Sequence, residues 1–67
     1  MELVEPLTNR EYEILTLLGQ RLTNREIAQA LFISHLTVKR HTSTIYQKLQ
    51  VNGRRNAVDK AKSLGLL

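Results

Sequence analysis

The side chains best able to do chemistry gather in one stretch of the chain, residues 35–49. If that stretch is a helix turning about 100° per residue, its apolar side would face a core, and that side carries Val38, Thr42, Ile45 and Leu49. The opposite side carries Leu36, Arg40, Ser43 and Gln47, with Lys39 and Thr44 on its flanks. Arg and Lys bind guanine O6 and N7, while Ser and Thr reach bases or phosphates. We therefore expect base contacts from Lys39, Arg40, Ser43 and Thr44, although a solvated face is the commoner explanation for an isolated helix.

Other residues are candidates for the phosphate backbone of a nucleic acid. Thr23 and Asn24 open the preceding predicted helix, where free amides and the positive end of the helix dipole favour a phosphate. Thr23 could equally serve as the helix cap alone. His35 opens the next predicted helix and is expected to be exposed, within reach of a phosphate. Arg54 is a further candidate, with a solvated side chain as the equal alternative.

Capping residues mark where the helices that position these side chains begin. The tetrapeptide Thr-Asn-Arg-Glu occurs at 8–11 and again at 23–26. In each copy the Thr hydroxyl can accept from the amide three residues on, and the Glu can reach back to the Thr amide. Ser34 caps a third helix, Asn52-Gly53 supplies the turn before a fourth, and Gly65 ends it. The sequence predicts an all-α fold of four helices, at about 9–19, 24–31, 35–49 and 54–64.

A short helix, a tight turn and a longer helix follow one another between Thr23 and Leu49. This is the helix-turn-helix arrangement, in which the first helix crosses the DNA backbone and the second enters the major groove. Leu36 in this arrangement either packs back on the fold or meets a thymine methyl group. The other three helices contribute apolar residues to one compact core: Ile14, Leu15, Leu18, Ile27, Ala28, Leu31, Ala57, Val58, Ala61 and Leu64.

Composition bounds the function further. With 67 residues the chain holds one domain with little room for a deep pocket; we expect a leader or linker stub at 1–6 and the domain at 7–67. Ten Lys and Arg against six Asp and Glu favour an anionic partner, nucleic acid before a membrane surface. No apolar run could span a membrane, and the lack of cysteine fits a reducing cytoplasm.

Enzymatic and metal-binding functions find no support in the sequence. His35 and His41 lack the Cys or nearby carboxylate partners that a zinc site needs. No serine has a plausible base and orienting acid. We therefore expect no enzyme, no metal and no cofactor. A protein-interaction module that binds an acidic partner is the alternative to DNA binding; RNA binding is disfavoured because stacking aromatics are lacking.

Six ordered segments resemble the LuxR-type helix-turn-helix domain. They are Leu-Thr-Asn-Arg-Glu at 7–11, Thr-Asn-Arg-Glu-Ile-Ala at 23–28, Leu-Phe-Ile-Ser at 31–34, Thr-Val-Lys-Arg-His at 37–41, Ile-Tyr-Gln-Lys-Leu at 45–49 and Ala-Val at 57–58. The ending is similar to that of large maltose-regulator-like activators, and response regulators share the domain. The resemblance implies a cytoplasmic bacterial transcription regulator that binds double-stranded DNA, with RNA polymerase as a further partner. It also implies that this domain is the output of a larger signal-responsive protein.

The resemblance implies roles for individual residues as well. It places Lys39, Arg40 and Ser43 or Thr44 at base edges, and it places near phosphates Thr23, Asn24, Thr37 and Lys48. It implies a homodimer on DNA through the last helix, about 54–64.

Three positions depart from the family pattern. Arg21 stands where the family often has Gly, which tolerates a left-handed backbone, so helix one is expected to end differently here. Gly53 and Asn56 replace the usual capping residues of the last helix, so the sequence marks the start of that helix, and a dimer built on it, less clearly than the other starts.

Overall fold

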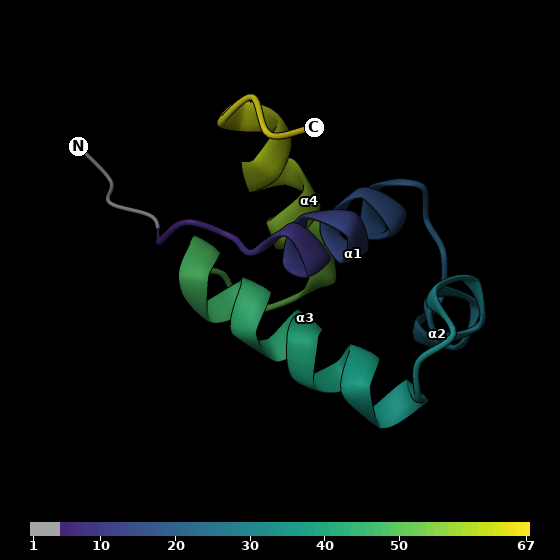
Figure 1. Ribbon diagram of the computed structural model, residues 1–67. Coiled ribbons are helices and arrows are strands. Elements are labelled where there is room, and N and C mark those ends of the chain that lie inside the picture. Colours follow the sequence, from purple (N-terminus) through teal and green to yellow (C-terminus); the bar gives the residue numbers. More distant parts are fainter. Residues whose placement is uncertain (1–4) are drawn as a thin grey trace.

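The structure, a computed structural model that describes residues 5–67, consists of four helices joined by short turns (Figure 1). They are α1 (Asn9–Gly19), α2 (Asn24–Leu31), α3 (His35–Leu49) and α4 (Arg54–Ser63). The all-α prediction is confirmed, with no strand among residues 5–67. Helix α4 ends one residue before the predicted 64, because Leu64 already serves as its C-cap. Of the predicted leader at 1–6, residues 1–4 lie outside the described part, and 5–6 have no regular structure.

Both Thr-Asn-Arg-Glu copies form complete capping boxes. At the start of α1, the Glu11 amide donates to Thr8 Oγ1 at 3.1 Å and the Thr8 amide donates to Glu11 Oε1 at 2.9 Å. At the start of α2, the corresponding distances between Thr23 and Glu26 are 3.1 and 2.8 Å. Helix α4 begins without a side-chain cap, since Gly53 has no side chain to offer. It nevertheless starts at Arg54, where the sequence predicts it.

All four helices end in the same kind of turn. A residue with left-handed backbone follows the helix, and the amide of the next residue donates to the carbonyl five positions earlier. The left-handed residues are Arg21 (φ 67°), Phe32 (φ 57°), Gln50 (φ 59°) and Gly65 (φ 75°). The expectation that Arg21 makes helix one end differently is thus wrong. Arg21 adopts the backbone that glycine would adopt, and the position costs about 1 kcal/mol for a residue with a Cβ.

One core joins the four helices. Its buried apolar members are Ile14, Leu15, Leu18, Ile27, Ala28, Val38, Ile45, Leu49, Ala57 and Ala61. Leu31 and Val58, also predicted for the core, are partly buried against it. The prediction for Leu64 is wrong: it follows the last turn of α4 and is 44% exposed.

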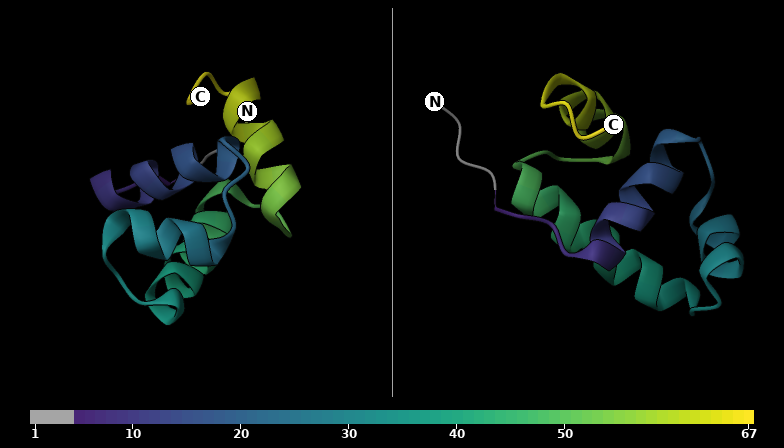
Figure 2. Two further views of the ribbon diagram at one scale, coloured as in Figure 1. Left: turned by 90° about the vertical axis from the view of Figure 1, so that its right-hand side faces the viewer. Right: turned by 45° about the horizontal axis from the view of Figure 1, so that its top comes forward.

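Helices α1 and α3 hold the molecule together, because each of them contacts the other three helices. In Figure 1, α1 and α4 lie on the same side of α3, and α2 lies near its N-terminal end. Figure 2 shows the last residues of the chain bending back from α4 toward α1. There the Tyr12 hydroxyl donates to the Leu66 carbonyl. The packing covers one side of α3 and leaves the other side uncovered.

Candidate nucleic-acid interface

The uncovered side of α3 carries the residues that the sequence predicts for base contacts. Lys39, Arg40 and Ser43 are exposed, whereas Val38 and Ile45 on the opposite side are fully buried. The polar residues thus lie on the exposed side of α3 and the apolar residues on the buried side, as the helical period predicts. Two cationic side chains and a hydroxyl point into solvent with no ion pair within the described part of the chain that would compete for them.

Thr44 lies at the edge of this surface rather than in it. The residue is partly buried, and its hydroxyl donates to the Arg40 carbonyl at 3.1 Å. With its proton used by the backbone, the Thr44 oxygen keeps only its lone pairs for a ligand. It can accept a hydrogen bond from a base amino group, but it is a poorer partner for guanine O6 or N7.

The start of α3 gathers polar groups next to that surface. Ser34 Oγ accepts from the Thr37 amide at 3.0 Å, and the Ser34 and Thr37 hydroxyl oxygens lie 2.8 Å apart. His35 is exposed and Thr37 is partly buried. The first amides of the helix have no partner within the helix, so this end can receive an anion.

The start of α2 is also capped by a hydroxyl, that of Thr23, but it carries in addition an acidic side chain, Glu26. Glu26 closes the capping box with Thr23 and remains exposed. Hydrogen bonding from the Thr23 backbone, and then from its side chain, lowers the pKa of the Glu26 carboxyl. Asn24, the first residue of the helix, is partly buried. The amides of Asn24 and Arg25 lack partners within the helix and stay available to a phosphate.

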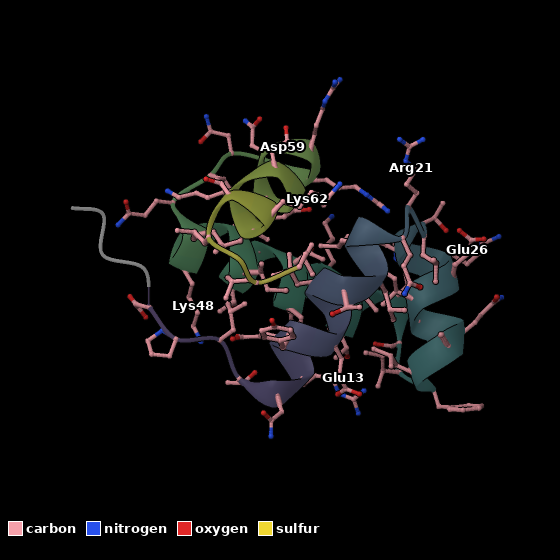
Figure 3. All side chains as sticks on the ribbon, turned by 90° about the horizontal axis from the view of Figure 1, so that it is seen from above. Glu13, Arg21, Glu26, Lys48, Asp59 and Lys62 are labelled. Carbon is pink, nitrogen blue, oxygen red and sulfur yellow. The ribbon has the colours of Figure 1, made fainter. Side chains whose placement is uncertain are left out.

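Lys48, which the family resemblance places near a phosphate, has a partner inside the protein. Its Nζ lies 2.7 Å from Glu11 Oε1, and the side chains are 17% and 7% exposed. Figure 3 shows Lys48 beside the N-terminal segment, on the far side of the molecule from Arg21 and Glu26. Burial raises the pKa of Glu11, but the hydrogen bonds from Lys48 and Thr8 outweigh it and lower that pKa. The sequence showed no sign of this pair, because its members are 37 residues apart.

Arg54 also has an internal partner, although one that leaves most of its donors unused. Its Nη2 donates to the Leu22 carbonyl, which ties the start of α4 to the linker before α2. The guanidinium has five N–H donors, and its charge is close enough to Glu26 to lower the pKa of that carboxyl. Arg54 is therefore held beside the start of α2 by the residue that precedes Thr23.

A basic hollow between the end of α1 and α4 is a feature that sequence reasoning missed. Its charged lining consists of Arg21, Arg54, Arg55, Lys62 and one acid, Asp59. Figure 3 shows Arg21, Asp59 and Lys62 over α4 and the end of α1. These residues come from two segments more than 30 positions apart, so no sequence spacing could have grouped them.

The part of the chain that the structure describes offers little to other kinds of site. Among residues 5–67 no group of three or more His, Cys, Asp or Glu is placed to hold a metal ion. Within the same residues, no helix has the length and apolar character needed to cross a membrane.

Together, α2, the left-handed turn at Phe32 and α3 define a helix-turn-helix domain, with a short capped helix followed by a longer one whose outer face is polar. Residues 5–61 match the family described as bacterial regulatory proteins, luxR family. The chain belongs to this family and is a LuxR-type helix-turn-helix DNA-binding domain. The resemblance of the sequence to this family is thereby confirmed.

Relatives and solved structures agree with that assignment. The chain is 49% identical over 61 residues to the spore germination protein GerE of Bacillus subtilis, covering 91% of this chain and 82% of GerE. It is 52% identical over 52 residues to the transcriptional regulatory protein DegU of Brevibacillus brevis, covering 78% of this chain and 22% of DegU. The structure of GerE superposes with a TM-score of 0.84 at 43% identity, covering 91% of each chain. The response regulator ChrA of a heme-sensing two-component system superposes with a TM-score of 0.90 at 46% identity, covering 94% of this chain and 31% of ChrA.

Proposed function

We propose that α3 lies in the major groove of double-stranded DNA and reads its sequence with Lys39, Arg40 and Ser43. The observation that carries this proposal is the exposure of these three side chains on the side of α3 opposite the core. Lys and Arg supply donors for guanine O6 and N7, and Ser can donate or accept. Thr44 adds an acceptor from the edge of the surface, toward a base amino group.

Phosphate contacts on either side would hold α3 in register. The start of α2, with Thr23 and Asn24, and the start of α3, with His35 and Thr37, both present free amides and the positive end of a helix dipole. Arg54 supports the first of these ends with the donors that Leu22 leaves unused. Lys48 stays a proposed phosphate contact, with the ammonium donors that its ion pair with Glu11 leaves unused.

The whole protein is proposed to be a cytoplasmic bacterial transcription regulator, with this domain as its output and no enzymatic role for it. The chain spans 22% of DegU and 27% of the response regulator protein VraR of Staphylococcus aureus, both of which are named as regulators. Regulation of transcription would bring the bound domain next to RNA polymerase, which we keep as a proposed partner.

Selection from random duplexes, followed by titration of variants against the selected duplex and a scrambled one, tests the proposal. The combined variant Lys39→Ala, Arg40→Ala, Ser43→Ala should lose the preference for the selected duplex, by roughly 10- to 100-fold. A control removes two cations from the side of α4 that carries the basic hollow, in the variant Arg55→Ala, Lys62→Ala, and should keep the preference. If the α3 variant keeps it too, the assignment of α3 to the groove is wrong.

A homodimer through α4 is the second part of the proposal, and the charges of α4 favour one of its sides. In a twofold dimer the same surface meets itself, so the basic hollow with Arg54, Arg55 and Lys62 would repel its copy. The other side is lined by Asn56, Lys60 and Ser63 and shares Asp59 with the hollow, so its charges are one acid and one base. On a duplex with two half-sites one helical turn apart, Asn56→Lys should abolish cooperative binding and leave binding to a single half-site unchanged.

A further inference from the structure

Leu36 is an apolar side chain at the N-terminal end of the exposed polar face of α3. It is 58% exposed and is not among the residues packed against the core, unlike Leu31 and Ile33 just before it. At about 100° per residue it falls within roughly 60° of Arg40, Ser43 and Gln47. Of the two possibilities that the sequence left open, the structure therefore removes packing back on the fold.

The position of Leu36 limits what could cover it. It is the second residue of α3, one helical turn before Arg40. In helix-turn-helix proteins the N-terminal part of the second helix contacts base edges. The edges that base pairs present in the major groove are hydrogen-bonding groups with one apolar exception, the C5-methyl group of thymine.

We propose that Leu36 is a specificity-determining residue that packs against a thymine methyl group, next to the base pair bound by Arg40. The inference rests on the proposed placement of α3 in the major groove and adds a sequence requirement to it. The side chain loses exposed apolar area only where a methyl group stands, so a cytosine, adenine or guanine in that place leaves it against polar atoms. Arg40 would thus recognise one base pair by hydrogen bonds, and Leu36, one helical turn before it, would recognise the neighbouring thymine by apolar contact.

Phe32 offers a comparison within the same region. It is 94% exposed and lies in the left-handed turn before α3 rather than on the helix. A protein partner that docked on exposed apolar residues of this region would use Phe32 as well as Leu36. A thymine methyl in the groove would engage Leu36 alone.

The test uses the duplex selected by the wild-type chain, with each thymine replaced in turn by deoxyuridine, which removes only the methyl group. For the wild type, one replacement should weaken binding about fourfold, the amount expected for one buried methyl. Leu36→Ala should weaken binding to the thymine duplex by at least as much and should no longer distinguish thymine from deoxyuridine at that position. Phe32→Ala and Leu64→Ala should keep the wild-type response to deoxyuridine; Leu64 is a second exposed leucine, at the C-cap of α4 rather than on α3.

The possible outcomes distinguish a failure of the proposal for Leu36 from a failure of the proposed DNA-binding function. If no thymine is sensitive to its methyl group, or if Leu36→Ala keeps the wild-type response, Leu36 does not read thymine although the domain binds DNA. If Leu36→Ala and Phe32→Ala leave every duplex affinity unchanged, neither residue contributes to DNA binding and the proposal for Leu36 is wrong. If the wild type selects no duplex at all, the proposed function itself fails. Thermal unfolding of Leu36→Ala should match the wild type, because the residue lies outside the core.

Discussion

The same four residues, Thr-Asn-Arg-Glu, begin both α1 and α2, yet the two copies end in different surroundings. Both build the same capping box, with distances that agree within 0.1 Å. Glu11 in the first copy is 5% exposed and bound to Lys48, whereas Glu26 in the second copy is exposed at the surface.

The comparison shows that local sequence decides the cap and tertiary packing decides what else the cap does. In α1 the glutamate also anchors the end of α3 through Lys48. In α2 it closes the helix start and leaves Thr23 and Asn24 at the surface, where we propose that a phosphate binds. One tetrapeptide thus serves the fold in one place and the candidate interface in the other.

The largest expected difference between the copies is in stability. Gln can replace Glu in a capping box, so Glu11→Gln removes the ion pair with Lys48 and keeps the cap. We expect it to lower the free energy of unfolding by about 2 kcal/mol, because it leaves the largely buried Lys48 ammonium opposite a neutral oxygen. Glu26→Gln, the matched control, should have a much smaller effect, because its carboxylate faces water. Urea unfolding followed by far-UV circular dichroism measures both; equal losses would mean that the Lys48 contact contributes nothing.

Protonation of Glu11 and of Glu26 should each lower the free energy of unfolding, and a substitution at Lys48 should affect only the contribution of Glu11. Both carboxyls have a pKa below the ordinary value of 4.5: Glu11 because hydrogen bonds from Lys48 and Thr8 outweigh the effect of burial, Glu26 because of its bonds to Thr23. A lowered folded-state pKa contributes stability that is complete above the unfolded-state pKa and is lost as the pH falls through the folded-state value.

Stability should therefore decline as the pH drops below about 5. Lys48→Met should reduce the part of that decline due to Glu11 and leave the part due to Glu26, which Glu26→Gln in turn removes. Unfolding free energies measured from pH 7 to pH 3 check this. An unchanged acid profile in Lys48→Met would show that the ion pair does not lower the Glu11 pKa.

The smallest expected effects on stability come from the turns that end α1 and α2. These two turns are alike. Arg21 after α1 and Phe32 after α2 both have left-handed backbone and exposed side chains. Arg21→Gly and Phe32→Gly should each raise the free energy of unfolding by about 0.5–1 kcal/mol, because glycine adopts this conformation without strain. Gln20→Gly is the control: its φ of −86° suits any residue, so glycine there should only destabilise. A loss of stability in Arg21→Gly would mean that the side chain makes a contribution larger than the strain.

Much of the fold could be predicted because its causes are local. Three side-chain caps set the starts of α1, α2 and α3, and the helical period separated Val38 from Arg40 on α3. Two predictions, for Leu64 and for Arg21, were wrong because residue type and helical spacing do not settle these positions. Leu64 has the spacing of a core residue but follows the last turn of α4, and Arg21 takes a left-handed turn that its residue type does not announce.

The candidate site divides in the same way. Lys39, Arg40 and Ser43 could be placed from spacing alone, since they share a helix and the period of that helix sets the face they occupy. Lys48 has a similar residue type and lies on the same helix, but its neighbour across the fold is Glu11. The basic hollow likewise needs Arg21 and Arg55 to be brought together by packing.

By itself, the sequence determined where the helices begin, which face of α3 is polar, and the family to which the chain belongs. Those properties depend on residues within a few positions of one another, through capping hydrogen bonds and the helical period. Only the tertiary structure decided that Glu11 is buried against Lys48 while Glu26 stays in water, and that Leu36 has no place in the core. These depend on which helix packs against which side, and that packing joins residues far apart in the chain.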